Sequence, residues 1–519
     1  MLQSEITGDG MDAVASEISL VERSSRCAIH IFTQTRFLEV TLCRKSAANY
    51  PENTAGKNGG RLMSREKLGS RLGFILLSAG CAIGIGNVWK FPYIVGQNGG
   101  GLFVIIYLVF LAILGIPVLT MEFSVGRAAQ CSPVKMYQQI EPKGSKWHYH
   151  GVAAMIGSYI LLMFYTTVAG WMLRYFFSTA GGALADLDAA GISEHFDSVL
   201  ADPLTMILFV AIVLAAAVLI CSIGLKNGLE RVTKVMMLAL LVIMVILAIN
   251  SFFMEGGEAG LAFYLKPNIE EIQKVGIGNV IVNAMNQAFF TLSLGMGGMA
   301  IFGSYIGKDR SLLGESVNVA LLDTFVAFSS GLIIFPACFA YGVDVDSGPS
   351  LIFLTLPNIF NHIPLGRLWG SLFFVFMSFA ALSTVLAVFE EITACVEDLT
   401  GWSRRKCCIF NGILLLVLSI PCCLGFNVLS GFQPLGEGTN IMDIEDFIVS
   451  NLVLPLGSLV LTLFCTMKKG WSWDNYIGEV NTGKGMKMKN FMRGYMTYIL
   501  PVMIAVIFVI GIIQKFFPA

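Results

Sequence analysis

Long apolar stretches separated by short polar segments run along the chain from residue 71 to residue 516. A transmembrane helix needs roughly 20 apolar residues to cross the hydrocarbon core, so each stretch predicts one membrane-spanning helix. Gly, Pro and charged residues in the intervening segments mark where the helices end. The eleven expected spans are 71–93, 101–125, 151–178, 203–224, 232–253, 277–305, 313–341, 368–396, 406–425, 442–466 and 493–516.

Residues 1–62 differ from the rest of the chain. They are polar and of mixed charge, and they lack the pattern of a signal peptide. We interpret them as a disordered cytoplasmic extension, or as the product of an upstream start assignment with Met63 as the true first residue. Residues 63–519 are the transmembrane domain in both interpretations.

The composition agrees with a chain that faces lipid. Only 13% of the 519 residues are charged, whereas a soluble domain has about 25%. The 12 cysteines have no paired CxxC spacing, and we interpret them as buried apolar residues rather than metal ligands. None of them falls in a predicted outer loop, so no disulfide framework is implied.

Basic residues are unevenly distributed between the loops. Lys and Arg are frequent before helix 1, in the loops after helices 2, 4, 6 and 8, and in the last loop, while segment 179–202 has five acidic residues and no basic one. Loops rich in Lys and Arg stay on the cytoplasmic side. We therefore expect a multi-pass protein of a bacterial-type inner membrane, with a cytoplasmic N-terminus and a C-terminus outside.

Two of the predicted helices contain glycine clusters. Helix 1 reads LLSAGCAIGIGNVWKFPY and helix 6 reads AFFTLSLGMGGMAIFGSY. Glycine weakens a helix, and freed backbone groups are tolerated at membrane depth only where they line a cavity. One such cluster alone would favour close helix packing through small residues. Two clusters, each in the first helix of a five-helix set, favour an inverted repeat with a binding site at the breaks.

A broken helix offers two kinds of binding group. The N-terminus of its second half carries a partial positive charge that suits a carboxylate. Its free carbonyls, together with hydroxyl and amide oxygens, suit a hard cation such as sodium. We find no nucleophile–base set and no phosphate-binding loop, since QNGGG follows no strand. The sequence therefore indicates neither an enzyme nor a nucleic-acid-binding protein.

Four motifs resemble one transporter family. The run RLGFILLSAGCAIGIGNVWKFPYIVGQNGGGLFVIIYLVFLAILGIPVLTMEFSVGR resembles the start of the neurotransmitter:sodium symporter family, as do FYTTVAGW in helix 3, NQAFFTLSLGMGG in helix 6 and FAALST in helix 8. The resemblance extends from about residue 64 to the C-terminus. It implies an all-α membrane protein with the LeuT fold, which has 11 transmembrane helices, a 5+5 inverted repeat and broken helices 1 and 6. It also implies sodium-coupled symport of an amino acid by alternating access.

The resemblance also implies site residues. The first sodium site would use Ala82, Asn87, Thr291 and Asp323. The second sodium site would use Gly80, Ile83, Ala380, Ser383 and Thr384. The substrate would contact Cys81, Ala82, Ile85, Gly86, Leu161, Tyr165, Phe290, Ser293, Met296, Thr384 and Val388. Tyr165 would donate its hydroxyl to the substrate carboxylate, Phe290 would cover the site, and the apolar lining favours a hydrophobic or aromatic L-amino acid.

Charged gates follow from the same resemblance. On the outside, Lys90 would face Asp446. On the inside, Arg65 would pair with Asp398, with Tyr305 nearby. The family usually has Arg at the position of Lys90, and Lys lacks the bidentate fork of Arg, so a weaker outer gate is expected.

Two further departures concern ions and release. Asp323 stands where relatives often have Asn, and its carboxylate would replace the chloride that other members bind beside Tyr107 and Gln287. We expect two sodium ions and chloride-independent transport. Asp323 either acts only as a sodium ligand or also takes up a proton on the return step. In helix 5, Leu238 stands where the family has a proline. That proline would help the helix unwind on the inner release path, so this path is expected to differ here.

Other acidic residues lie within the predicted spans. Such residues are costly in lipid and must face the interior or a helix end. We expect Glu122 to support the broken helix 1, while Glu390 and Glu391 have no assigned role.

Two functions of other classes compete with the symporter. A membrane sensor could bind sodium or an amino acid without transporting it, and a channel could conduct ions. The channel is disfavoured because the interior polar residues cluster at one depth instead of forming rings along a path. The expected partners are an amino-acid substrate and the lipid bilayer, with no obligate protein partner.

Overall fold

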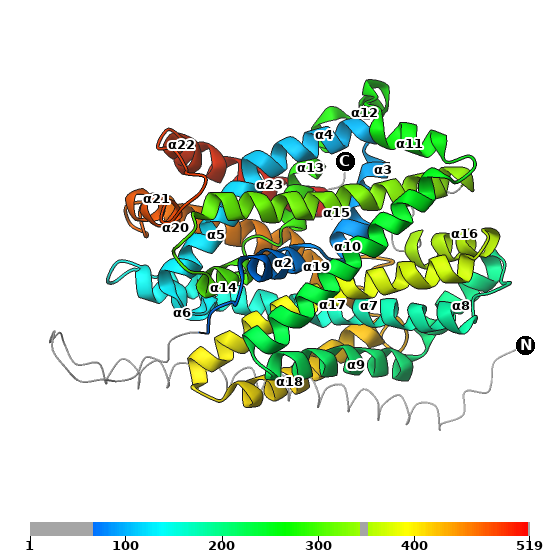
Figure 1. The fold of residues 1–519 in the computed structure, drawn as a ribbon, viewed down its shortest axis with the longest axis horizontal. Coiled ribbons are helices and arrows are strands. Elements are labelled where there is room, and N and C mark those ends of the chain that lie inside the picture. Colours follow the sequence, from blue (N-terminus) through cyan, green and yellow to red (C-terminus); the bar gives the residue numbers. More distant parts are fainter. Residues whose placement is uncertain (1–65, 343–350, 517–519) are drawn as a thin grey trace, which may run out of the picture. The chain divides into compact units, whose positions relative to one another are not determined.

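The helices of the computed structural model follow the apolar stretches. The structure describes residues 66–342 and 351–516, and helices are the only extended regular elements among them, beside two isolated β-bridges. Figure 1 shows these helices packed alongside one another. The interpretation of residues 1–62 lies outside the described residues.

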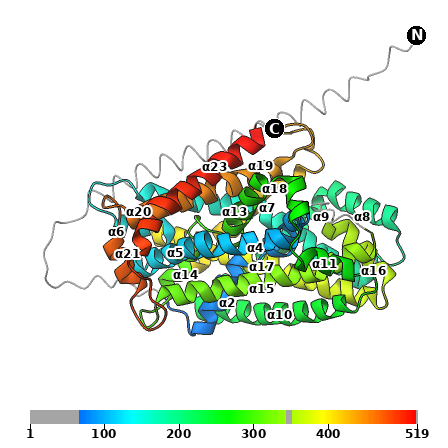
Figure 2. The ribbon, with the colours of Figure 1, turned by 90° about the horizontal axis from the view of Figure 1, so that it is seen from above.

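Each predicted span corresponds to a helix or to a group of consecutive helical segments, some of them π-helical (η). The spans are α2 (Arg71–Ala82), η1 (Gly86–Lys90) and α3 (Phe91–Gln97); α4 (Gly101–Phe110), η2 (Leu111–Gly115) and α5 (Ile116–Ala129); α7 (His148–Gly181); α9 (Pro203–Ser222); η3 (Leu225–Glu230) and α10 (Arg231–Phe252); α13 (Ile277–Thr291) and α14 (Gly298–Tyr305); α15 (Leu312–Ala340); α17 (Gly366–Thr400); α18 (Arg404–Leu424); α19 (Ile441–Phe447), η5 (Ile448–Val453) and α20 (Leu454–Thr466); α22 (Met492–Gly494), η6 (Tyr495–Ile499) and α23 (Leu500–Phe516). In Figure 2, α10 and α23 lie on opposite faces of this group.

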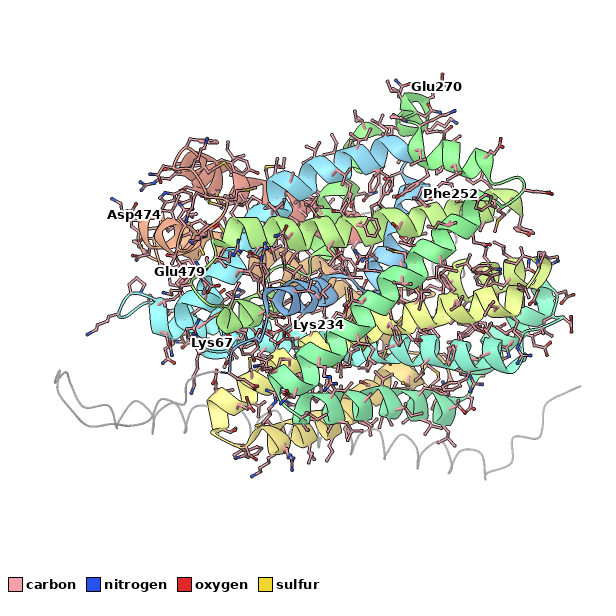
Figure 3. The ribbon with its side chains drawn as sticks, in the orientation of Figure 1. Lys67, Lys234, Phe252, Glu270, Asp474 and Glu479 are labelled. Atoms are coloured by element: carbon pink, nitrogen blue, oxygen red, sulfur yellow. The ribbon has the colours of Figure 1, made fainter. Side chains whose placement is uncertain are left out.

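Short helices occupy the connections. They are α6 (Pro133–Ile140), α8 (Ala189–Ala201), α11 (Glu258–Leu265), α12 (Ile269–Val275), η4 (Leu351–Thr355), α16 (Leu356–His362) and α21 (Trp473–Val480). Figure 1 places α8, α11, α12 and α16 at one end of the bundle and α6 and α21 at the other. Figure 3 shows the same separation, with Glu270 at the first end and Asp474 and Glu479 at the second.

Helices 1 and 6 are both interrupted. In helix 1, α2 ends at Ala82 and the chain resumes as a helix at Gly86, with a bend of 59° between the two parts. In helix 6, residues 292–297 separate α13 from α14. Gly295 and Gly297 have φ values of 93° and 99°, which an L side chain rarely adopts. The glycine clusters therefore mark where each helix breaks, as predicted.

The second half of helix 6, α14, packs closely against α5 of helix 2. A methyl group on Gly126 of α5 would overlap the carbonyl of Ala300 in α14, and one on Gly303 of α14 would overlap the carbonyl of Phe123 in α5. A glycine on each helix therefore lets the two backbones touch.

Helix 5 begins with a wide turn instead of a proline kink. Gly224 has φ 114°, η3 follows it, and α10 then continues unbroken through Leu238. Without the proline, α10 is continuous, and the irregular backbone lies at the entry to the helix.

Candidate functional site

The first predicted sodium-site residues meet where helix 1 is broken. The amide nitrogen of Asn87 donates to Asp323 Oδ1 (2.7 Å) and Thr291 Oγ1 (3.1 Å). Thr291 donates to Asp323 Oδ2 (2.9 Å), and the backbone N–H of Gly84 donates to Asn87 Oδ1 (3.2 Å). Asn87, Thr291 and Asp323 are buried, and Ala82 ends the helix just before them. This buried group of oxygen atoms could bind a hard cation.

All five residues predicted for the second sodium site also lie together. Ser383 and Thr384 on α17 face the end of α2. Ser383 Oγ donates to the carbonyls of Ala380 (2.9 Å) and Ile83 (3.4 Å). Thr384 Oγ1 lies 3.3 Å from the carbonyl oxygens of both Gly80 and Ile83. Backbone carbonyls freed by the end of α2 and two hydroxyls thus converge on one point.

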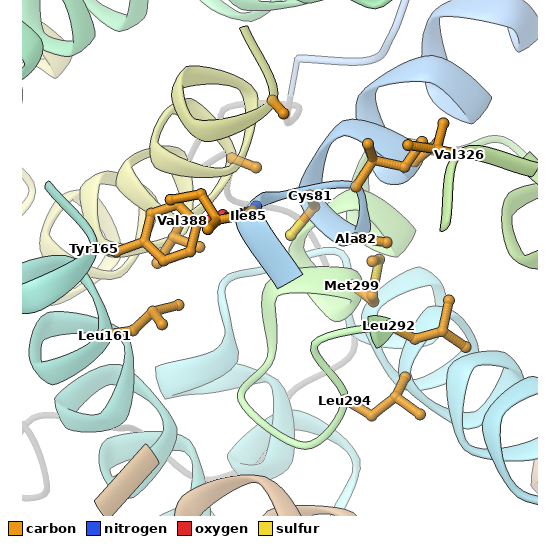
Figure 4. Packing of buried hydrophobic residues seen from close by; sticks show 14 of the residues in the cluster. Cys81, Ala82, Ile85, Leu161, Tyr165, Leu292, Leu294, Met299, Val326 and Val388 are labelled. Atoms are coloured by element: carbon orange, nitrogen blue, oxygen red, sulfur yellow. Dashed lines mark hydrogen bonds between the residues drawn. The ribbon is translucent and has the colours of Figure 1, made fainter. Parts of the chain in front are cut away.

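Tyr165 connects α7 to the break in helix 1. Its hydroxyl accepts a hydrogen bond of 2.9 Å from the backbone N–H of Ile85. A methyl group on Gly84 would collide with that hydroxyl and with Thr384, so only glycine fits there. In Figure 4, Ile85, Tyr165 and Val388 lie side by side, with Leu161 next to them on α7.

A cavity of about 340 Å³ opens above this contact. It is lined by Ile85, Gly86, Trp89, Lys90, Tyr93, Phe164, Tyr165, Val168, Phe290, Met442, Asp443 and Asp446. Most of the lining is apolar or aromatic, and the charged residues come from helix 1 and α19. The sequence interpretation did not include Trp89, Phe164 or Val168. Only their position along the wall of this cavity identifies them as site residues.

Not every predicted substrate residue reaches the cavity. Its lining does not include Cys81, Ala82, Leu161, Ser293, Met296, Thr384 or Val388. Among these, Cys81, Met296 and Val388 are almost fully buried beside the helix breaks. Ser293 adopts φ 49° within the break of helix 6. A methyl group on Gly86 would lie 2.6 Å from Cε1 of Phe290, so Phe290 packs directly against helix 1.

Comparison with known proteins identifies the family. A model of the Sodium:neurotransmitter symporter family matches residues 65–189 and 192–518. The chain belongs to this family. It is 34% identical to the uncharacterized sodium-dependent transporter YhdH of Bacillus subtilis, covering 86% of this chain and 98% of the relative. An uncharacterized sodium-dependent transporter of Haemophilus influenzae is 28% identical over the same shares of the two chains.

A solved structure agrees with this membership. The crystal structure of MhsT in complex with L-phenylalanine matches with a TM-score of 0.77 and 37% identity, covering 86% of this chain and all of that one. The predicted LeuT fold with broken helices 1 and 6 is confirmed. The chain is therefore a multi-pass, sodium-dependent membrane transporter and not an enzyme.

The predicted outer-gate residues of this symporter line one cavity without forming an ion pair. Lys90 Nζ lies 3.7 Å from the centre of the Phe290 ring, a cation–π contact. Asp446 accepts a hydrogen bond of 2.8 Å from Ser450. Both side chains border the cavity.

Around the residues predicted for the inner gate, the contacts centre on Glu390. Tyr305 donates to Glu390 Oε1 (2.7 Å). Arg404 also donates to Glu390, from Nη1 at 3.1 Å and from Nη2. Asp398 accepts from the backbone N–H of Ser132 (2.7 Å). Arg65, predicted for this gate, lies outside the described residues. No sequence pattern indicated the Glu390–Arg404 pair, because the turn between α17 and α18 brings the two residues together.

Glu122 contacts helix 6, whereas we expected it to support helix 1. Its Oε1 accepts hydrogen bonds from the backbone N–H groups of Gly295 (2.6 Å) and Gly297 (3.4 Å). The expectation was wrong about the helix because α5 packs closely against α14, which brings the break of helix 6 within reach. Glu122 therefore satisfies backbone groups that the break leaves free.

Within the described part of the chain, two further polar side chains have no hydrogen-bond partner. They are Tyr107, at its hydroxyl, and Gln287, at both amide atoms. Both are buried. These are the positions at which chloride-dependent relatives were expected to bind the anion, and here the Asp323 carboxylate lies close to Tyr107.

Proposed function

We propose that this symporter imports a hydrophobic or aromatic L-amino acid together with two sodium ions, by alternating access. The observation that carries the proposal is the position of the cavity. It ends at Ile85, Gly86 and Tyr165, next to the break in helix 1. A zwitterion lodged there would lie close to both groups of oxygen atoms, so ion and substrate could stabilise each other.

The amino-acid backbone would be held at the helix breaks. The hydroxyl of Tyr165 uses a lone pair to accept from Ile85, and its own proton can be donated to a carboxylate. Freed backbone groups at the breaks supply further donors and acceptors. Tyr165 would orient the carboxylate, and the carbonyls of the broken helix 6 would accept from the ammonium group.

The character of the cavity supports an apolar substrate side chain. Phe164, Val168 and Phe290 line it, and Val388 and Leu161 pack just behind it. MhsT, which has a similar fold, was crystallised with L-phenylalanine. Phe290 lies against Gly86 and would cover the bound substrate.

Two sodium ions fit the two groups of oxygen atoms. The first ion would bind Ala82, Asn87, Thr291 and Asp323, and the second would bind Gly80, Ile83, Ala380, Ser383 and Thr384. Each sodium ion that enters down a potential of 100 mV contributes about 2.3 kcal/mol. Two ions therefore suffice to concentrate a small solute, before their concentration gradient is counted.

Transport is proposed to be independent of chloride. Asp323 brings a fixed carboxylate to the first site, and a chloride ion beside Tyr107 would lie close to that negative charge. Uptake with gluconate in place of chloride tests this point. Unchanged uptake is expected, and a large loss would show that Tyr107 and Gln287 bind the anion instead.

The proposed orientation places the basic loops in the cytoplasm of a bacterial-type inner membrane. The end of the bundle with α6 and α21 would then face the cytoplasm, and the end with α8, α11, α12 and α16 would face outward. Cysteine labelling from outside tests this orientation. A cysteine at Gly278, near the start of α13, should react in intact cells, whereas one at Gly478 in α21 should not.

Proteoliposomes test the function itself. Purified protein is reconstituted, an inward sodium gradient is imposed, and uptake of labelled L-phenylalanine is followed in competition with other amino acids. We expect accumulation that disappears when the gradient is collapsed by an ionophore. Binding of L-phenylalanine without accumulation would instead identify a sensor, and accumulation without sodium would exclude the proposed coupling.

A further inference from the structure

Glu391 is a buried carboxyl group that the proposed transport mechanism does not use. It lies on α17 and has no solvent exposure. Among the described residues, neither of its carboxylate oxygens has a hydrogen-bond partner, and the ion pairs do not include it. An isolated buried carboxylate is costly, because burial removes the water that stabilises its charge.

The carboxyl of Glu391 faces the break in helix 6. A methyl group on Gly297 would lie 3.1 Å from Glu391 Oε1, and one on Gly298 would lie 3.5 Å from Oε2. Glu122 contacts the same break, where its Oε1 accepts hydrogen bonds from the N–H groups of Gly295 and Gly297. Two carboxyl groups from different helices thus approach one short stretch of backbone.

The two carboxyl groups have different surroundings. Glu122 receives backbone N–H donors at the start of α14, and such donors stabilise a negative charge. Glu391 receives none. The hydroxyl of Ser158 lies beside it but gives its own proton to the carbonyl of Ala154 (3.1 Å). While Ser158 makes that bond, it has no proton to offer a charged Glu391, but it can accept a hydrogen bond from a protonated one.

The other titratable groups around the pair do not supply a positive charge. They are Cys81 on α2, Tyr137 on α6 and Cys395 on α17. On α17 itself, the neighbouring Glu390 is paired with Arg404. Ser458 on α20 adds an unpartnered buried hydroxyl at the break, where a methyl group on Gly295 would lie 2.8 Å from its Oγ.

We propose that Glu391 and Glu122 form a proton-binding site at the break of helix 6, in which Glu391 holds the proton and Glu122 carries the charge. Releasing the proton to water would leave two neighbouring carboxylates in a medium that screens charge poorly. Their repulsion would act on the backbone between Gly295 and Gly298, which both groups contact. By linkage, proton occupancy and the conformation of this break must then influence each other. The site is separate from Asp323 and from both groups proposed to bind sodium.

Infrared spectroscopy of the full chain in lipid tests the site without depending on transport. The carbonyl stretch of a protonated carboxylic acid is followed as pH is raised. The wild type should show this band at neutral pH and lose it under alkaline conditions. Glu391→Gln should lack it, while Glu270→Gln, which changes an exposed residue of α12, should retain it. Asp323→Asn identifies any separate band from Asp323.

A second variant keeps the test informative if Glu391→Gln does not fold. In Glu122→Gln the neighbouring charge is gone, so the Glu391 band should disappear at a pH lower by about one unit or more. Two outcomes overturn the proposal. The first is an unchanged band in Glu391→Gln or an unshifted titration in Glu122→Gln. The second is loss of the band at constant pH when sodium is added, because the pair would then bind the cation instead of a proton.

Discussion

The hydroxyl of Tyr165 on α7 accepts a hydrogen bond of 2.9 Å from the backbone N–H of Ile85, and so holds the break in helix 1 against helix 3. Replacing Tyr165 with Phe removes this acceptor and the proposed donor to the substrate carboxylate. An unsatisfied buried N–H costs about 1–3 kcal/mol. We therefore expect L-phenylalanine affinity to fall at least tenfold in a binding assay.

Tyr159→Phe is the matched control for this change. Tyr159 lies on the same helix and donates to Asn411 Oδ1 (2.7 Å), away from the cavity. The Tyr159→Phe variant should lose stability without a comparable loss of affinity for L-phenylalanine. Equal affinity losses in the two variants would contradict the role given to Tyr165.

Gly86→Ala tests the approach of Phe290 to helix 1. The new methyl group would lie 2.6 Å from the Phe290 ring, so the ring must move away from the cavity end. Substrate affinity should fall about tenfold, since crowding of this kind costs roughly 1–3 kcal/mol. A second change, Phe290→Leu, should cost less in the Gly86→Ala background than in the wild type. Gly278→Ala, where a methyl group meets nothing within 4 Å, should leave uptake unchanged.

Thr384→Val tests the second proposed sodium site. Valine keeps the shape of threonine but loses the hydroxyl that faces the carbonyls of Gly80 and Ile83. The sodium concentration for half-maximal uptake should rise several-fold, and the Hill coefficient should fall toward one. Thr400→Val on the same helix removes a hydroxyl that donates to the Val396 carbonyl and accepts from the backbone N–H of Trp402. If both variants show the same sodium dependence, Thr384 is not an ion ligand.

Arg404→Ala should destabilise the fold. Glu390 is fully buried, and Arg404 is its cationic partner. Removing one member of a buried ion pair costs about 3–5 kcal/mol, because the other charge is left uncompensated. Thermal unfolding should therefore begin at a clearly lower temperature. Arg405→Ala alters an exposed neighbour and should have little effect, and adding Glu390→Gln to Arg404→Ala should recover part of the loss.

Glu141 gives a stability change with a defined pH direction. Its partial burial would raise its pKa, but hydrogen bonds from Ser145 and His148 outweigh this and lower the pKa below the usual 4.5. A carboxyl group whose pKa is lowered in the folded state stabilises the protein at pH values above its ordinary, unfolded-state pKa. This stabilisation is lost as the pH falls through the lowered, folded-state pKa. Glu141→Gln should thus be less stable than wild type by about 0.5–1 kcal/mol at pH 7. The difference in unfolding temperature should vanish in strong acid, and a constant difference would contradict this assignment.

The sequence predicted most of what depends on composition and on glycine. Apolar stretches located each span to within a few residues at most ends, and glycine clusters located both breaks, because unwinding needs residues that accept unusual φ values. The π-helical segments were not predicted. A π turn differs from an α turn by one residue in its hydrogen bonding, and no residue type in Gly86–Lys90 or Leu225–Glu230 requires that shift.

Contacts between distant elements could be predicted only where the family resemblance supplied them. The five residues around Ser383 came from it and lie together. The Glu390–Arg404 pair depends on how α17 and α18 turn back on each other, and the partner of Glu122 depends on which neighbour of α5 lies closer. The periodicity of residues along a single helix shows neither how two helices turn back on each other nor which neighbouring helix lies closer.

The glycine contacts between α5 and α14 have a consequence for how the molecule can change shape. Gly126 and Gly303 place two backbones in direct contact, with no side chains between them that could change rotamer and absorb a displacement. The two segments must therefore travel as one rigid piece. Any movement that tilts the second half of helix 6 has to carry this stretch of helix 2 with it, and its hinge must then lie on the other side of the break in helix 6.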